Sequence, residues 1–449
     1  MAFLKSIRFS KPPLHKVLLV LTLCYFLAFA IMMAYISGQP DSVHHTYLSE
    51  RFSNTWGIPE ENMRNRFVIT GQPYLYYWIL GAVTKIIRLA VPAETLPSLL
   101  IWRLSSVLMS LLTVFYLYKL ISKITKNPYA GVLGAFFLSN TLMFVFLSGG
   151  VNYDNLMNLA SMAAIYHLVN LYKGEDFVRN TTLMGIWLCI GALTKEQTLL
   201  LALILFIAWL FYILKHNKSI KLIFNRVNWI RIGVFILLIG LMVSLYGVNY
   251  FKYNKLTPSC QQIKTKEVCT SFSDRIEKEV AVDLRWLWNI RNTFTDNPFQ
   301  YAFSFWILQM LRSIWGIISH NTFVPMVAVS LHGALIIWGL FNLARYWKKT
   351  NHLQNLLIFI LVCYLIYVFQ LNYSYELRYN FKHFAIQGRY LLPVIGPLYA
   401  LLIDAFLRMR SITFKRLTIA LSVILYFAGG LGVFIFRYAE VFAHWRIYF

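Results

Sequence analysis

Charged residues are scarce in this sequence of 449 residues, since Asp, Glu, Lys and Arg together make up only 13% of it. Hydrophobic residues make up 58%. Soluble globular domains carry about 25% charged residues, so the composition excludes that class. Acidic residues are scarcer than basic ones, with 18 Asp and Glu against 42 Lys and Arg. In a membrane protein this excess first indicates orientation and attraction to anionic lipid, and only then phosphate-binding groups.

The sequence also lacks internal repeats, low-complexity tracts and a linker to a separate soluble domain. It has five cysteines, of which Cys24, Cys189 and Cys363 lie in apolar segments. Cys260 and Cys269 lie close together in a polar segment. They could form a disulfide in an oxidising compartment, or remain two reduced cysteines.

The sequence consists largely of long apolar runs. Several of them reach or approach the roughly 20 residues that a membrane-spanning helix needs. The first run, residues 17–36, follows four basic residues and exceeds a usual signal-peptide core, so we expect an uncleaved helix. We predict an all-α polytopic membrane protein with about eleven transmembrane helices. The later runs are 99–121, 129–147, 155–171, 183–193, 199–214, 230–250, 324–343, 353–371, 390–407 and 417–436.

Residues 183–214 form one apolar tract that is interrupted by Lys195 and Glu196. Each of these charges at mid-bilayer would cost roughly 2.5–3.5 kcal/mol. We therefore predict a hairpin of two helices with its turn at this pair.

The orientation depends on residues 74–91, an apolar and aromatic stretch with two basic residues. If it lies along the outer interface without crossing, nearly all short basic clusters face the cytoplasm, as the positive-inside tendency requires. We therefore predict an interfacial helix there. Two long outer segments follow, 38–98 and 251–323, and the second contains a re-entrant or surface helix at 299–318.

The first candidate for chemistry lies directly after the first predicted helix, where Pro40 precedes Asp41. A carboxylate at the membrane surface could act as a general base for an acceptor hydroxyl, or could simply cap the next helix. His44 and His45 follow as candidate substrate-binding residues. No third metal ligand lies at a recognisable spacing.

The second candidate is Asp154, in a glycine-rich turn that faces the same side. Its carboxylate could serve in catalysis or could cap the following helix. Asn152 and Asp154 resemble half of a metal site, but no partner carboxylate accompanies them, so a divalent metal has weak support.

The remaining candidates are cations on the outer side, Lys195 with Glu196, and Arg389 with Tyr390. Such cations depart from the positive-inside preference, and an anionic phosphate would explain them. The alternative is that each side chain merely extends to the lipid interface. All four candidate segments reach one membrane face, which capping alone would not require.

These motifs, in this order and spacing, resemble the GT-C superfamily of polytopic glycosyltransferases. The layout is close to that of bacterial lipid A aminoarabinose transferases and protein O-mannosyltransferases. The motifs are Pro40-Asp41 with His45, Gln72-Pro73-Tyr74-Leu75-Tyr76-Tyr77-Trp78, Asn152-Tyr153-Asp154, Leu193-Thr194-Lys195 and Gly388-Arg389-Tyr390-Leu391-Leu392-Pro393. The resemblance covers most of the chain and implies a GT-C-like fold.

The resemblance implies transfer of a sugar from a polyprenyl-phosphate or pyrophosphate carrier to a lipid, glycan or protein acceptor, with inversion. Asp41 would be the general base, and Lys195 and Arg389 would stabilise the leaving phosphate. Tyr76 and Tyr77 would flank the sugar or the carrier headgroup. Many relatives carry a second carboxylate beside the first, whereas Ser42 stands here. We therefore assign no certain cofactor.

The resemblance further implies one transmembrane domain over residues 1–449, without the soluble C-terminal domain of some relatives. We expect a multi-pass protein of the bacterial inner membrane, with its site facing the periplasm or cell exterior and no nucleic-acid partner. Two alternatives remain. A transporter or flippase for lipid-linked saccharides would show inverted repeats and broken helices, and an assembly protein would use the same residues as unrelated caps and anchors.

Overall fold

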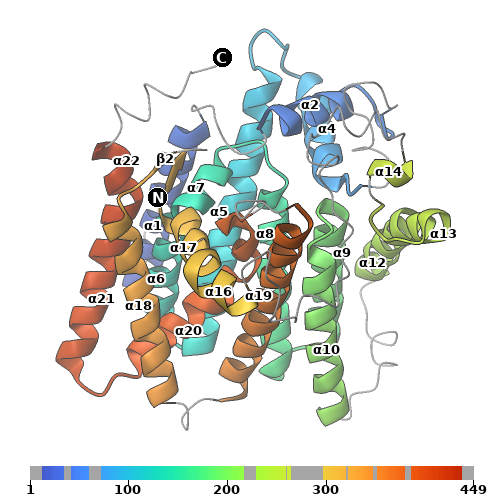
Figure 1. The fold of residues 1–449 in the computed structure, drawn as a ribbon. Coiled ribbons are helices and arrows are strands. Elements are labelled where there is room, and N and C mark those ends of the chain that lie inside the picture. The colour runs from blue at the N-terminus through green and yellow to red at the C-terminus, as the bar shows by residue number, and fades with distance from the viewer. Residues whose placement is uncertain are drawn as a thin grey trace, which may run out of the picture.

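The computed structural model describes residues 13–34, 42–59, 72–216, 229–258, 260–263, 297–319, 322–346, 351–379 and 386–436. Nearly all of them lie in helices that pack side by side in one bundle (Figure 1). The strands in these ranges are β1 (Ile317–Ser319) and β2 (Thr322–Phe323), which pair antiparallel. The regular structure of these ranges is therefore helical apart from this short pair, in agreement with the predicted all-α class.

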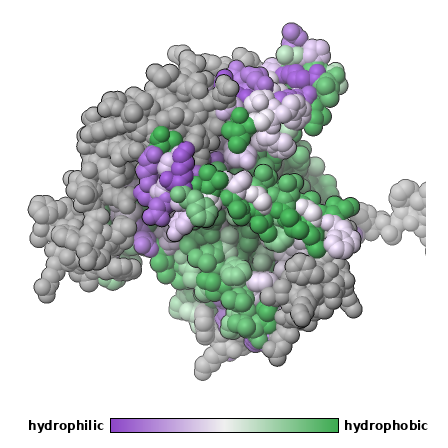
Figure 2. Space-filling model, turned by 90° about the vertical axis from the view of Figure 1, so that its right-hand side faces the viewer, coloured by the Kyte–Doolittle hydropathy of each residue, from purple (hydrophilic) through white to green (hydrophobic). Residues whose placement is uncertain are grey.

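Nine helices of the described ranges are long and apolar enough to cross a membrane, and a bent pair would be a tenth. The nine are α1 (Leu14–Ala34), α5 (Ser98–Thr125), α9 (Phe177–Thr194), α10 (Thr198–His216), α12 to α13 (Trp229–Tyr253), α18 (Met326–Arg345), α19 (His352–Tyr379), η6 with α20 (Gly388–Leu407) and α21 to α22 (Ile412–Phe436). Apolar residues cover much of the described surface on the side of α10 and α12 (Figure 2). This surface suits contact with lipid.

The helix α8 (Asp154–Tyr172) is 19 residues long and buried along almost its whole length. Its sequence is too polar for it to count among the nine candidate spans. The helices α5, α9 and α10 pack around it, so few of its polar side chains reach the surface. Such a helix fills the centre of a bundle. With α8 and the bent pair, each apolar run identified in the sequence contains a helix or a helix pair in the described structure.

The run at 129–147 is broken, whereas the sequence suggested one continuous helix. It forms α6 (Pro128–Ser139) and α7 (Leu142–Ser148), which meet at an angle of 72°. The break falls at Asn140, whose side-chain oxygen accepts a hydrogen bond of 2.5 Å from the Tyr25 hydroxyl. This tertiary contact holds a buried polar side chain where the chain changes direction.

The predicted interfacial helix is present as α4 (Leu75–Arg88). It packs against α2 (Ser42–Ser53) and α5 at the top of the bundle in Figure 1. One side of α4 is buried, and its 14 residues span about 21 Å, less than a hydrocarbon core. Its placement along a membrane surface remains a prediction.

The two basic residues of α4 bind backbone oxygens. The Lys85 ammonium donates to the carbonyl of Phe52 at 2.8 Å, and Nη2 of Arg88 donates to the carbonyl of Leu96 at 2.6 Å. Both side chains thus fasten α4 to the neighbouring chain while remaining partly exposed.

The helical segment predicted at 299–318 forms α16 (Pro298–Tyr301), η4 (Ala302–Trp306) and α17 (Ile307–Trp315), followed by β1. The α17 helix packs against α7, α18 and η6 within the bundle. Whether the segment is re-entrant remains a prediction. The short helix α14 (Cys260–Ile263) is described, but Cys269, the other half of the disulfide considered above, lies outside the described residues.

Candidate functional site

The turn between α7 and α8 is fixed by two asparagine side chains. Oδ1 of Asn152 accepts a hydrogen bond of 2.8 Å from the backbone N–H of Asp154. The amide of Asn155 donates to the carbonyls of Leu147 at 2.9 Å and Gly150 at 3.2 Å. These local bonds hold the first turn of α8. They therefore fix the backbone from which the Asp154 side chain extends.

Gly149 brings this turn against the end of α1. A Cβ atom at Gly149 would lie 2.4 Å from the carbonyl carbon of Met33, closer than real Cβ contacts allow. Only glycine permits this approach of two backbones.

The Asp154 carboxylate binds two cations from distant parts of the chain. Nζ of Lys195, in the turn between α9 and α10, lies 2.6 Å from Oδ1. Nε of Arg389, in the 3₁₀-helix η6 (Gly388–Val394), lies 3.7 Å from Oδ2. The side chain of Asp154 is fully buried, and those of Lys195 and Arg389 are 7% and 6% exposed. We call these three residues the charge cluster.

Two tyrosine rings enclose the ammonium of Lys195. Nζ lies 4.5 Å from the ring centre of Tyr153 and 5.0 Å from that of Tyr390. Burial by itself lowers the pKa of Lys195, but the Asp154 carboxylate together with Tyr153 and Tyr390 outweighs burial and raises the pKa above the ordinary value of 10.5. Lys195 is therefore a permanent cation at neutral pH. Burial raises the pKa of Tyr153, which keeps its phenol protonated.

His45 joins α2 to the same region. Its Nδ1 lies 2.5 Å from the hydroxyl oxygen of Tyr77, and its ring meets that of Tyr153 edge-on at a centroid distance of 4.6 Å. His45 is buried, whereas His44 is partly exposed. The structure thus brings His45 and Tyr77 into contact with the residue that flanks the charge cluster.

Tyr76 has a structural position. Its ring is fully buried, and its hydroxyl lies 2.8 Å from Oγ of Ser106 in α5. The same hydroxyl accepts a hydrogen bond of 2.9 Å from the backbone N–H of Asn152. This tyrosine links α4 and α5 to the turn before Asp154, a placement that favours support of the turn over contact with substrate.

Gly388 fixes the position of the neighbouring residue Arg389, because it lets η6 pack closely against α17. A Cβ at Gly388 would lie 2.6 Å from the backbone nitrogen of Ile314, so η6 packs backbone against backbone on α17. The N–H of Gly388 also donates to Oγ of Ser313 at 2.7 Å. The guanidinium that follows is thereby aimed at the start of α8.

One further predicted site residue, Glu196, does not join this arrangement. Glu196 is exposed, unlike its buried neighbour Lys195. Asp41, the predicted base, lies outside the described residues. Within the described ranges, no three His, Cys, Asp or Glu side chains lie close enough to share a metal ion.

Sequence reasoning missed Tyr153 and Arg103 as candidates. The guanidinium of Arg103, buried in α5, donates to the carbonyl of Ala34 at the end of α1. A lone arginine within an apolar run could have signalled it. Tyr153 could have been noticed only as the residue before Asp154, because its contact with Lys195 is tertiary.

Residues 71–246 match the sequence model of a protein family. That family is described as dolichyl-phosphate-mannose-protein mannosyltransferase. The matched part includes Tyr76, Asp154 and Lys195 and leaves out Arg389. The resemblance to polytopic glycosyltransferases is confirmed over this part of the chain. No curated protein matches the sequence.

Solved structures to which this chain is similar include ArnT from Cupriavidus metallidurans bound to undecaprenyl phosphate, with 13% identity and a TM-score of 0.49. That match covers 90% of this chain and 62% of ArnT. The Archaeoglobus fulgidus oligosaccharyltransferase in its apo form has 14% identity and a TM-score of 0.47. That match covers 96% of this chain and 56% of the archaeal enzyme. This chain thus spans less than two thirds of the length of either protein.

Proposed function

We propose that this multi-pass membrane protein is a glycosyltransferase that moves a sugar from a polyprenyl-phosphate or pyrophosphate carrier to an acceptor on the non-cytoplasmic side. The observation that carries the proposal is the charge cluster, in which one carboxylate holds the cations Lys195 and Arg389 side by side. The match to the mannosyltransferase family over residues 71–246 supports the same reaction class. The bacterial inner membrane is the proposed location.

The charge balance of the cluster suits a phosphate leaving group. Two cations and one carboxylate leave one net positive charge in a largely buried region. When the bond between the anomeric carbon and the phosphate oxygen breaks, negative charge grows on the phosphate. Preformed cations stabilise that charge without reorganisation, and removal of one such group typically costs about 10²–10³-fold in rate.

Asp41 is the proposed general base. The acceptor hydroxyl attacks the anomeric carbon, its proton passes to the carboxylate of Asp41, and the phosphate leaves from the opposite face with inversion. A positioned base contributes about 10²–10⁴-fold. The neighbours of Asp41 in sequence support this role, because Met33 adjoins the turn before α8 and His45 contacts Tyr153.

Asp154 is proposed to position the cations, and Tyr153 and Tyr390 to hold Lys195 between them. His44, His45, Tyr77 and Glu196 are proposed to contact the sugar or the acceptor. The family description makes dolichyl-phosphate mannose and a protein acceptor the first pair of substrates to test.

A transporter or flippase for lipid-linked saccharides is the second candidate. The bent pair α6 and α7 favours it, since transporters use broken helices near their substrates. A transporter would move the carrier-linked sugar across the bilayer without breaking the bond to phosphate.

The test is to reconstitute the purified protein in liposomes with radiolabelled polyprenyl-phosphate sugars and a membrane acceptor extract. The proposal expects label to move from the carrier to the acceptor. Arg416→Ala, which removes an exposed cation in α21, serves as the control and should transfer as well as the wild type. Label that crosses the bilayer while still attached to its carrier would identify a flippase instead.

A further inference from the structure

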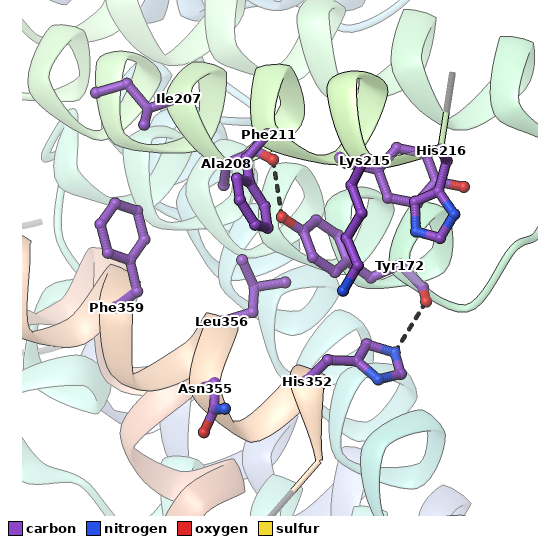
Figure 3. Close-up of a pocket in the computed structure, with 11 residues that line it drawn as sticks. Tyr172, Ile207, Ala208, Phe211, Lys215, His216, His352, Asn355, Leu356 and Phe359 are labelled. Carbon is purple, nitrogen blue, oxygen red and sulfur yellow. Dashed lines mark hydrogen bonds between the residues drawn. The ribbon is translucent and has the colours of Figure 1, made fainter. Parts of the chain in front are cut away.

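A second site lies at the other end of the bundle. A cavity of about 560 Å³ opens between α10 and α19, beside Tyr172 at the end of α8 (Figure 3). Its polar residues belong to the last turn of α10 and the first turn of α19. The charge cluster lies beside the start of α10 (Thr198–His216), and along that helix Ile207 is about 14 Å and Lys215 about 26 Å from the start. The cavity is therefore independent of the site proposed for sugar transfer.

One part of the cavity is apolar and faces outward. Ile207 and Phe211 of α10 and Phe359 of α19 line it, and Figure 3 shows Ile207 and Phe359 away from the histidines. These three side chains are exposed although they are hydrophobic. The helix α10, which carries Ile207 and Phe211, lies on the side of the bundle where much of the described surface is apolar (Figure 2). An alkyl chain suits this part of the cavity.

The other part carries cationic and hydrogen-bonding groups. Lys215, His216 and His352 lie there together (Figure 3). A ring nitrogen of His352, Nε2, lies 3.1 Å from the carbonyl oxygen of Tyr172. The Tyr172 hydroxyl in turn donates to the carbonyl of Ala208 at 2.8 Å. These bonds tie α8, α10 and α19 into a fixed frame around the cavity.

Among the described residues, no carboxylate lines the cavity. The acidic residues of the neighbouring turn are engaged elsewhere, since Glu175 pairs with Lys123 and Asp176 accepts a hydrogen bond from the N–H of Arg179. The ammonium of Lys215 forms no hydrogen bond or ion pair within the described part of the chain. The ammonium of Lys215 is therefore available to bind an anion from outside the protein.

We propose that the cavity binds one anionic glycerophospholipid from the leaflet opposite the charge cluster. Its phosphate lies at Lys215, His216 and His352, and an acyl chain lies along Ile207, Phe211 and Phe359. This ligand suits both parts of the cavity, because a free phosphate has no acyl chain and a zwitterionic lipid has no net negative charge to pair with Lys215. If the predicted orientation holds, this is the cytoplasmic leaflet.

Native mass spectrometry of the full-length protein in detergent tests the site. The probes are phosphatidylglycerol, phosphatidylcholine with the same acyl chains, and inorganic phosphate. We expect a one-lipid complex with phosphatidylglycerol at concentrations where phosphatidylcholine gives little. Lys215→Glu should weaken that complex on the order of tenfold. The matched control is Lys415→Glu, the same change on α21, and it should leave binding unchanged.

A second variant tests the contact with the acyl chain of the lipid, whereas Lys215→Glu tests the contact with its phosphate. Ile207→Trp fills the apolar part and keeps all three polar residues, so it should also weaken the phosphatidylglycerol complex. Ile207 is exposed, and thermal melting without lipid verifies that either variant is folded. Equal binding of phosphatidylglycerol and phosphatidylcholine to the wild type would overturn the proposal. So would an equal loss in Lys215→Glu and Lys415→Glu, or full competition by inorganic phosphate.

Discussion

The ammonium of Lys195 lies 2.6 Å from a carboxylate oxygen of Asp154, although 41 residues separate them in the chain. The reason is a helical hairpin of equal arms. Asp154 begins α8, which has 19 residues, and Lys195 follows α9, which has 18. Because the arms are antiparallel and rise by the same amount per residue, the start of one and the end of the other meet at the same level.

The buried ion pair predicts a large effect of removing one partner. Asp154→Asn keeps the shape of the side chain but leaves Lys195 and Arg389 without their carboxylate, which should destabilise the protein by about 3–5 kcal/mol. Thermal melting in detergent measures the loss. The double variant Asp154→Asn/Lys195→Met should lose less than the sum of the two single variants, and strictly additive losses would show that the pair does not couple.

The raised pKa of Lys195 predicts how this stability depends on pH. A group whose pKa is higher in the folded than in the unfolded state stabilises the fold fully below the unfolded value, here about 10.5. The contribution disappears as the pH rises through the folded pKa. The difference in melting temperature between the wild type and Lys195→Met should therefore stay constant from about pH 7 to about pH 9 and shrink above about pH 10.5. A difference that already shrinks near neutral pH would contradict this account.

Gly388→Ala should impair sugar transfer without touching a charged group. The new methyl group would meet the backbone of α17, so η6 must shift and carry Arg389 away from the cluster. We expect a loss of transfer on the order of 10²-fold, as for a misplaced catalytic group. The matched control is Gly233→Ala, since a Cβ at Gly233 meets no atom within 4 Å. Equal activity of the two variants would argue that the position of η6 is unimportant.

Tyr76→Phe should mainly reduce stability. The variant removes the acceptor for the N–H of Asn152, and an unsatisfied buried group costs about 1–3 kcal/mol. Tyr129→Phe, which alters a half-exposed tyrosine of α6, should melt like the wild type. If Tyr76→Phe melts normally but loses transfer, the hydroxyl contacts substrate after all.

The sequence predicted the helices because apolar runs and charges are local features. The hairpin at Lys195 followed from the cost of two charges in the bilayer, and the shared face of Asp154, Lys195 and Arg389 followed from counting helices. The break at Asn140 could not be predicted in the same way. At the break, Asn140 accepts a hydrogen bond from Tyr25, a residue of another helix, and such a tertiary contact leaves no local signal in the sequence.

The side-chain partners within the site were also beyond the sequence. Tyr76 and Tyr77 are adjacent and were assigned one role, yet the fold directs one hydroxyl to the backbone of Asn152 and the other to His45. Successive residues on a helix point about 100° apart, so their partners depend on which helix packs on each side. The position of Asp154 between two cations likewise required the structure.

The most direct test of the central claim is transfer of radiolabelled sugar from polyprenyl-phosphate donors by the wild type, Asp41→Asn and Arg389→Ala. Thermal melting and membrane insertion verify that each variant is folded. We predict that Asp41→Asn loses about 10²–10⁴-fold in rate and Arg389→Ala about 10²–10³-fold. Full transfer by Asp41→Asn would contradict the proposed mechanism.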